Sequence, residues 1–97
     1  MPRALFSPRA REDLFDIWLY IAAHNTNAAD DFIAKILEVA DLVTALPYIG
    51  RIRNELKGRP RSIAVDSYVL FYQTSATGSR VLRVLHGSRD IPLFLIS

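Results

Sequence analysis

Several residue types on which protein chemistry commonly depends are absent or scarce. There is no cysteine, so the chain can form neither a disulfide nor a thiolate metal site. The two histidines, His24 and His86, lie far apart in sequence and outside any His-Glu-x-x-His pattern. The four glycines never cluster where a strand would lead into a helix, as a phosphate-binding loop requires. We therefore expect no metal and no cofactor, and the lack of disulfides favours a cytoplasmic location.

Long apolar runs are absent as well. No segment approaches the roughly 18 apolar residues that span a bilayer, and the N-terminus lacks the apolar core of a signal peptide. We expect no contact with membranes. The 97 residues, 51% of them hydrophobic, can support one modest core, because two cores would each be too small to offset chain entropy. The prediction is a single domain over residues 1–97.

The charge is small in total but unevenly distributed. The formal net charge of +2 is low for a protein that depends on phosphate contacts. Residues 1–48 hold four basic and seven acidic side chains, whereas residues 49–97 hold eight basic and three acidic ones. One interpretation is a basic C-terminal half that faces an acidic partner, either a protein or a nucleic acid. The other is a solvated face that only keeps the protein soluble.

Two amphipathic helices are predicted in the N-terminal half. The first begins at Ser7-Pro8, because a serine oxygen can accept an unpaired amide proton and proline at the first helical position has none. Apolar residues spaced by three and four continue it to about His24. Asn27 is the expected cap of the second helix, which ends at Leu46-Pro47. The short polar break between them predicts an antiparallel hairpin. The expected buried stripe of the second helix is Ala29, Phe32, Ile33, Ile36, Ala40 and Val43.

The C-terminal half changes to a period of two. Residues 62–65, 68–74 and 80–86 are rich in β-branched and aromatic side chains, and short loops join them as antiparallel neighbours. In the last run, odd-numbered residues such as Val81 and Leu85 should share one face of the sheet, and even-numbered ones such as Val84 the other.

The segments outside these elements are predicted as follows. Residues 3–6 are compatible with an edge strand, and residues 48–61 are predicted to form a basic loop punctuated by glycine and proline. The predicted fold is therefore α+β: an N-terminal strand and an antiparallel helical hairpin packed on a three- to four-stranded antiparallel sheet.

Two groups of charged residues are candidates for function. Glu12, Asp13 and Asp16 resemble paired catalytic carboxylates, but helix starts attract acidic side chains electrostatically, so a structural role is expected. A basic group could bind phosphate or a protein carboxylate through charge-assisted hydrogen bonds. Its alternative is to brace the fold, with Arg89 paired to Asp90 or to a helix carboxylate. The target-binding candidates are Arg59, Arg61, Arg83, His86 and Arg89.

Several short segments follow one another in a recognisable order. The first carries an acidic residue followed by Ile17-Trp18-x-Tyr20-Ile21, and the last reads Arg83-Val84-Leu85-His86-Gly87-x-Arg89-Asp90. Together they resemble the ParE branch of the ParE/RelE toxin superfamily. Between them lie Asn27-Ala28-Ala29, Leu46-Pro47-x-x-Gly50-Arg51, Arg61-Ser62 and Tyr68-Val69-Leu70-Phe71-Tyr72.

The resemblance implies a toxin that inhibits DNA gyrase by protein binding, without catalysis, and is neutralised by a ParD-like antitoxin. It implies no direct sequence-specific nucleic-acid binding by this chain. The alternative is a RelE-like ribosome-dependent mRNA interferase. The sequence departs from that pattern, because Val69 replaces an arginine and Phe94 falls near the position of a late tyrosine. Valine cannot stabilise a phosphorane-like charge, and phenylalanine has no hydroxyl for proton transfer. A third reading is a remnant with no active target, which would leave growth unimpaired.

Surplus apolar residues also predict a protein interface. A domain of this size with apolar residues on its first helix, both sheet faces and its tail should expose a hydrophobic patch, which a disordered antitoxin segment could cover. Core packing is the competing explanation for the tryptophan and for the helical phenylalanine. The antitoxin-binding candidates are Trp18, Tyr20, Phe32 and Phe94.

Overall fold

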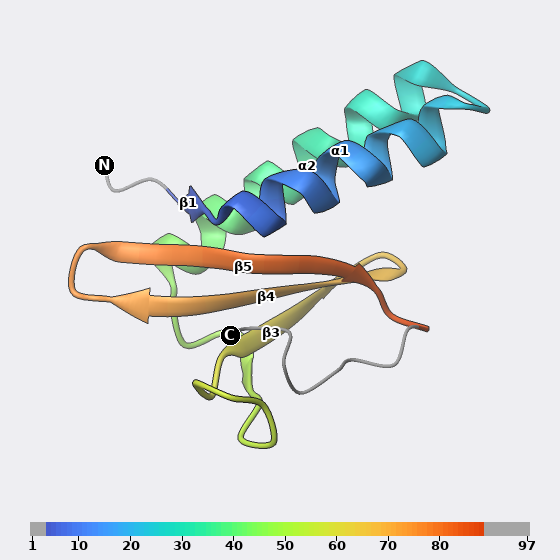
Figure 1. The fold of residues 1–97 in the computed structure, drawn as a ribbon. Helices are drawn as coiled ribbons and strands as arrows, with labels where there is room; N and C mark the ends of the chain where they lie inside the picture. Colours follow the sequence, from blue (N-terminus) through green and yellow to red (C-terminus); the bar gives the residue numbers. More distant parts are fainter. Residues whose placement is uncertain (1–3, 89–97) are drawn as a thin grey trace.

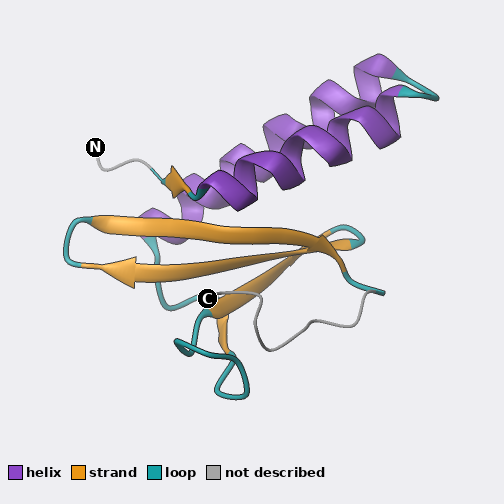
Figure 2. Ribbon diagram, in the orientation of Figure 1, coloured by secondary structure: helices purple, strands orange, loops and turns teal. Residues whose placement is uncertain are grey.

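The protein has two layers, a helical hairpin on one face of a mixed sheet (Figures 1 and 2). A computed structural model describes residues 4–88. In that range the sheet order is β1-β5-β4-β3-β2, with β1 parallel to β5 and the other pairs antiparallel. The predicted α+β fold is confirmed. The elements are β1 (Leu5–Phe6), α1 (Pro8–Ala22), α2 (Thr26–Ala45), β2 (Arg51–Ile52), β3 (Arg61–Val65), β4 (Tyr68–Ser75) and β5 (Gly78–His86).

The helix starts follow from side-chain caps. Ser7 caps α1, because its hydroxyl oxygen accepts the backbone N–H of Ala10 at 3.0 Å. For α2 the expected cap was wrong by two residues: Asn25 accepts the N–H of Ala28 at 3.0 Å, and Asn27 lies inside the first turn. Because α1 also ends earlier than predicted, at Ala22, the connection is shifted by two residues toward the N-terminus and keeps its predicted length. Neither helix within residues 4–88 is long and apolar enough to cross a membrane.

The main core lies between the hairpin and the sheet. The predicted stripe of α2 faces it, with Ile36, Ala40 and Val43 fully buried and Phe32 partly buried against the cluster. Figure 1 shows the hairpin lying over one face of the sheet, with its tip projecting beyond the end where β5 stops. On the far face, Phe71 and Leu85 form a second cluster that the chain covers with its own Leu56. Both sheet faces are thus covered, at least in part, from within the described chain.

Two short strands flank the three long ones: β1 confirms the predicted N-terminal strand, and the sheet has five strands and is mixed, where three to four antiparallel strands were predicted. β1 pairs in parallel with β5, Leu5 opposite Arg80 and Phe6 opposite Val81. β2 was predicted as loop, but Arg51 and Ile52 pair with the first residues of β3. Two residues are too few to display a period of two, so the pattern in the sequence does not distinguish such a strand from a loop.

A bulge in β5 changes which side chains face the helices. Phe71 lies opposite Arg83, but the next residue, Tyr72, lies opposite Val81, so Leu82 is the extra residue. As a result Val81 and Val84 both belong to the core under the helices, while Leu85 belongs to the far cluster. The prediction that Val81 and Leu85 share a face is therefore wrong.

A buried ion pair joins α1 to β5. The Asp13 carboxylate accepts Nε of Arg83 at 2.7 Å and Nη2 at 3.0 Å, and it also accepts the backbone N–H of Val84 at 3.0 Å. The two side chains are 10% and 12% exposed. The pairing with Asp13 raises the pKa of Arg83. Asp13 thus has a structural role, as predicted. Because it lies beyond the first turn of α1, that role comes from the ion pair and not from the charge of the helix end.

Replacement of Asp13 by alanine should destabilise the protein severely. The substitution leaves the guanidinium of Arg83 and the Val84 amide without their acceptor, and such a loss typically costs about 3–5 kcal/mol in the free energy of unfolding. Urea denaturation measures it. Asp16→Ala, an exposed acidic residue of the same helix, is the control and should change stability by less than about 0.5 kcal/mol. Equal losses in the two variants would contradict this role.

Candidate functional site

The structure separates the target-binding candidates into different places. Arg61 lies opposite Tyr72 in the sheet, whereas His86 lies opposite Tyr68, four residues along β4. At the rise of an extended strand the two positions are about 13 Å apart. Arg83 lies in the ion pair with Asp13. Arg59 joins Arg61 in one cleft, while Arg89 and the antitoxin candidate Phe94 fall outside the described residues.

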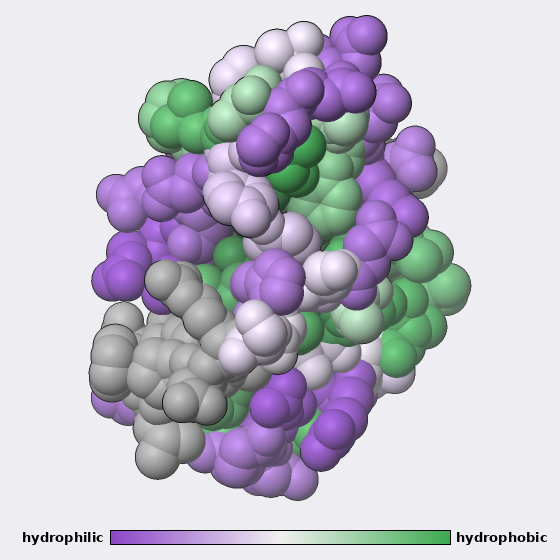
Figure 3. Space-filling model, turned by 90° about the vertical axis from the view of Figure 1, so that its right-hand side faces the viewer, coloured by the Kyte–Doolittle hydropathy of each residue, from purple (hydrophilic) through white to green (hydrophobic). Residues whose placement is uncertain are grey.

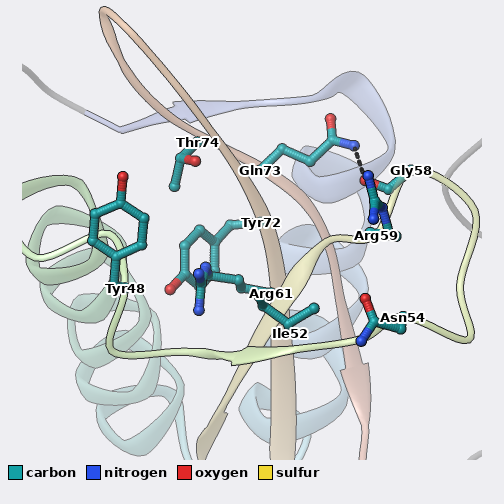
Figure 4. Close-up of a pocket in the computed structure, with 9 residues that line it drawn as sticks. All are labelled: Tyr48, Ile52, Asn54, Gly58, Arg59, Arg61, Tyr72, Gln73 and Thr74. Carbon is teal, nitrogen blue, oxygen red and sulfur yellow. Dashed lines mark hydrogen bonds between the residues drawn. The ribbon is translucent and has the colours of Figure 1, made fainter.

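We call the first site the basic cleft. It opens where α2 ends and the β2–β3 connection crosses the end of the sheet, and its volume is about 360 Å³ (Figure 4). Two arginines and several uncharged polar side chains line it, with no carboxylate among them. Its lining residues are Tyr48, Ile52, Asn54, Gly58, Arg59, Arg61, Tyr72, Gln73 and Thr74.

Tyr72 and Arg61 shape the inner wall of the basic cleft. The buried Tyr72 hydroxyl accepts the N–H of Gly50 at 2.9 Å and donates to the carbonyl of Pro47 at 2.8 Å. Burial raises the pKa of Tyr72 above its ordinary value. A Cβ on Gly50 would lie 2.4 Å from that hydroxyl, which explains glycine at this position. The chain after α2 is thereby fixed against β4.

One nitrogen of the Arg61 guanidinium is hydrogen-bonded within the protein, and the side chain also lines the cleft. Its Nη1 donates to the carbonyl of Gly50 at 2.8 Å, and its guanidinium stacks over the ring of Tyr48, 5.0 Å from the centroid. The Tyr48 side chain is 76% exposed and forms the outer wall. The segment Leu46-Pro47-x-x-Gly50-Arg51, part of the family resemblance in the sequence, lies in this region. Tyr48 lies within that segment but was not predicted as a site residue.

Arg59 occupies a strained position at the mouth of the basic cleft. Gly58 has a φ of 80° and Arg59 a φ of 44°, and Pro60 follows. A positive φ costs a residue with a Cβ about 1–2 kcal/mol, and a following proline disfavours helical conformations further. The Arg59 N–H donates to the carbonyl of Leu56 at 3.0 Å, and Gln73 Nε2 donates to the carbonyl of Gly58 at 3.3 Å. The loop therefore holds Arg59 in a conformation that the residue itself disfavours.

The other arginine beside the cleft is already paired. Arg53 donates from Nε to Glu55 at 2.8 Å and lies over the ring of Phe71 at 5.5 Å. A backbone hydrogen bond and this arginine lower the pKa of Glu55. Within residues 4–88, by contrast, neither Arg59 nor Arg61 forms an ion pair with a carboxylate. Both arginines that line the cleft therefore carry a positive charge that no carboxylate of residues 4–88 pairs with.

A second site lies at the opposite end of the sheet, and we call it the aromatic groove. Its volume is about 580 Å³, and it opens between the C-terminal part of α1 and the ends of β4 and β5. Figure 3 shows this end of the molecule, with green apolar surface between purple hydrophilic side chains. The groove is lined by Asp16, Ile17, Tyr20, Ile21, Ser67, Tyr68 and His86.

The aromatic groove joins candidates that the sequence had assigned to different partners. Tyr20 is 71% exposed, and it lines the groove together with His86. Tyr68 contacts both Phe32 and His86, at centroid distances of 5.2 and 5.1 Å. Burial raises the pKa of Tyr68. Trp18 is half-buried and donates from Nε1 to Asp30 of α2 at 2.8 Å, so it braces the hairpin.

The candidate polar side chains of the described residues are spread over the sheet and not gathered at one point. His86 bonds through Nδ1 to Ser88 at 2.7 Å, far from both arginines of the basic cleft. The Tyr72 hydroxyl is saturated by two backbone partners. Residues 4–88 hold no group of three or more His, Asp or Glu side chains placed to bind a metal ion. The described geometry supports binding of an anion and of apolar side chains.

Comparisons with known proteins agree on one family. The family described as the ParE toxin of the type II toxin–antitoxin system parDE matches residues 4–91. Toxin ParE1 of Mycobacterium tuberculosis is 31% identical over 91 residues, which cover 92% of this chain and 93% of that protein. Toxin ParE1 of Caulobacter vibrioides is 30% identical over 85 residues, with 87% and 88% covered.

A solved structure confirms the likeness in fold. The structure described as a chromosomal ParDE toxin–antitoxin system from P. aeruginosa superposes with a TM-score of 0.71 at 18% sequence identity. The superposition covers 89% of this chain and 96% of that one. At this identity the likeness establishes the fold alone.

Replacement of Arg59 by glycine should stabilise the protein. Glycine adopts a positive φ without a Cβ clash, so the free energy of unfolding should rise by about 1 kcal/mol, reduced somewhat by the greater flexibility of the unfolded chain. Urea denaturation measures the change. Lys57→Gly is the control in the same loop, where the described backbone has no positive φ to relieve, and it should not stabilise. Loss of stability in Arg59→Gly equal to that in the control would show that the position is unstrained.

Proposed function

The chain belongs to the ParE toxin family of type II toxin–antitoxin systems, and we propose that it inhibits growth by docking onto DNA gyrase, without catalysing a reaction. The separation of its polar side chains supports this mechanism. A ribonuclease needs an acid, a base and a positive charge around one phosphate. Here the arginines of the basic cleft and His86 lie at opposite ends of the sheet.

The pairing of Arg83 supports the same mechanism. In the sequence Arg83 was a candidate for contact with a target, but its guanidinium is occupied by Asp13 on the inside of the fold. A buried pair of this kind braces the structure, and an incoming anion would have to displace a carboxylate that also binds Val84. Target contact through positive charge is therefore assigned to Arg59 and Arg61.

The environment of Val69 argues against the mRNA interferase alternative. Val69 packs beside Phe71 on the far face, against the cluster that contains Leu56 and Leu85. An arginine at this position would be available for a phosphate on that face, whereas valine contributes only apolar surface. The alternative makes a distinct prediction, cleavage of translated messages, which separates it from gyrase inhibition.

Neutralisation is proposed to occur through a ParD-like antitoxin that occupies the aromatic groove. Tyr20 offers a large exposed aromatic surface there, and the half-buried Tyr68 forms a floor with the exposed His86 beside it. Aromatic side chains are enriched at protein interfaces because they bury much area at low entropic cost. Phe32 supports the floor through Tyr68, and Trp18 supports the hairpin through Asp30.

The purified toxin should inhibit DNA supercoiling by gyrase and leave translated messages intact. Arg59→Gln removes the charge without relieving the backbone strain, and it should raise the concentration needed for half inhibition about tenfold, as loss of a charged interface contact does. Arg9→Gln, at an exposed position of α1, is the control and should inhibit as the wild type does. Unchanged supercoiling together with cleavage at translated codons would establish the mRNA interferase instead.

Antitoxin binding should depend on Tyr20 more than on Tyr48. Truncation of an exposed aromatic anchor within an interface typically weakens binding tenfold or more, so Tyr20→Ala should raise the dissociation constant by about that factor. Titration calorimetry with the ParD-like antitoxin measures it. Tyr48→Ala is the matched control, because this tyrosine is equally exposed but lies in the basic cleft. If Tyr48→Ala weakened binding as much as Tyr20→Ala, the antitoxin would not be specific for the aromatic groove.

A further inference from the structure

The basic cleft has an apolar border that its charge does not explain. Leu46 and Ile49 follow α2, and Ile52 belongs to β2; all three are exposed, as is Tyr48 between them. Ile52 and Tyr48 line the cleft directly. Two positive side chains thus share one cleft with aliphatic and aromatic surface.

The two arginines of the cleft lack the carboxylate partners that three other cations of the described chain have. Lys35 pairs with Asp66, Arg53 with Glu55 and Arg83 with Asp13. Arg59 and Arg61 have no such carboxylate among residues 4–88, and the polar side chains around them, Gln73 among them, carry no charge. The cleft therefore presents donors for an acceptor that comes from outside.

From this combination we infer that the basic cleft receives the carboxylate of a glutamate or aspartate carried by an apolar segment of a protein partner. The inference rests on the proposed function and deepens that function, because it names the chemistry of the target segment that the toxin binds. Guanidinium groups bind carboxylates through paired, charge-assisted hydrogen bonds, and Arg59 and Arg61 supply two of them. A cleft of about 360 Å³ accommodates one side chain, with its flanking apolar neighbours on Tyr48 and Ile52.

A protein carboxylate fits these observations better than a nucleic-acid phosphate. A phosphodiester chain would place its charge beside exposed aliphatic side chains, which do not stabilise a charge. The net charge of +2 supplies little further attraction for a nucleic acid. One face of the Tyr48 ring is already covered by Arg61, so the ring is only partly open for stacking on a base. Tyrosine and arginine surrounded by apolar residues are the usual composition of an energetic centre in a protein–protein interface.

The strain at Arg59 is consistent with this role. Glycine would suit its φ of 44° better, yet the residue present carries a guanidinium at the mouth of the cleft. Residues held in unfavourable backbone conformations concentrate at functional sites, where the surrounding contacts compensate for the strain. The Leu56 carbonyl and the Gln73 side chain hold the strained turn before any partner arrives.

Nuclear magnetic resonance titration of the full chain with short probes tests the inference. The probes are the peptide acetyl-Leu-Glu-Leu-amide, its neutral twin acetyl-Leu-Gln-Leu-amide, and a single-stranded hexathymidylate. The acidic peptide should shift the Arg59 side-chain signal and the Gly58 and Gln73 amide signals, with a dissociation constant about tenfold lower than that of the neutral peptide. Arg59→Gln should abolish the difference between the two peptides, and Arg9→Gln should preserve it.

Three outcomes would overturn the inference: no shift at the cleft with any probe, equal affinity for both peptides, or tighter binding of hexathymidylate than of the acidic peptide at these signals. The result is independent of the supercoiling assay. Selectivity for the acidic peptide without gyrase inhibition would refute gyrase as the target and leave the cleft assignment intact. Gyrase inhibition without peptide selectivity would refute the cleft assignment alone.

Discussion

The Asp13 carboxylate is the contact on which the arrangement of the two layers depends. It lies on α1 but bonds to two groups of β5, the guanidinium of Arg83 and the backbone N–H of Val84. β1 pairs with β5 only at Arg80 and Val81, so the edge of β5 beyond that point would otherwise expose unpaired backbone groups. Ser7 pairs a further backbone group on this edge of β5, because its hydroxyl donates to the carbonyl of Leu82 at 2.8 Å. The start of the hairpin is thereby fixed along the strand edge.

This arrangement decides which charges are available to a partner. Arg83 is committed inside the fold, whereas Arg59 and Arg61 line the basic cleft without a carboxylate partner among residues 4–88. The aromatic groove lies about 13 Å away along β4, a distance that about four residues of extended chain would span. The groove and the cleft are therefore separate surfaces, and different partners can occupy them.

Several features of the basic cleft lower the stability or solubility of the protein. A positive φ at Arg59, an exposed Tyr48 and exposed aliphatic residues after α2 each lower the stability or solubility that the same fold could have. Most of the remaining described structure is locally consistent, with capped helices and no buried side-chain nitrogen or oxygen left without a hydrogen bond, although Asp66 in the β3–β4 turn also has a positive φ, of 54°. Local conflicts that gather on one surface are typical of functional sites.

The sequence alone determined the helices, the three long strands, the buried stripe of α2 and the family, because caps, apolar periods and ordered segments are local patterns. Tertiary structure alone decided the role of Arg83, since its partner Asp13 lies 70 residues away and no spacing rule connects them. The same holds for the bulge at Leu82, for the two-residue strand β2, for the parallel pairing of β1 with β5, and for the meeting of Tyr20 with His86. Each depends on which segments lie side by side after folding, and a periodic pattern carries no information about that.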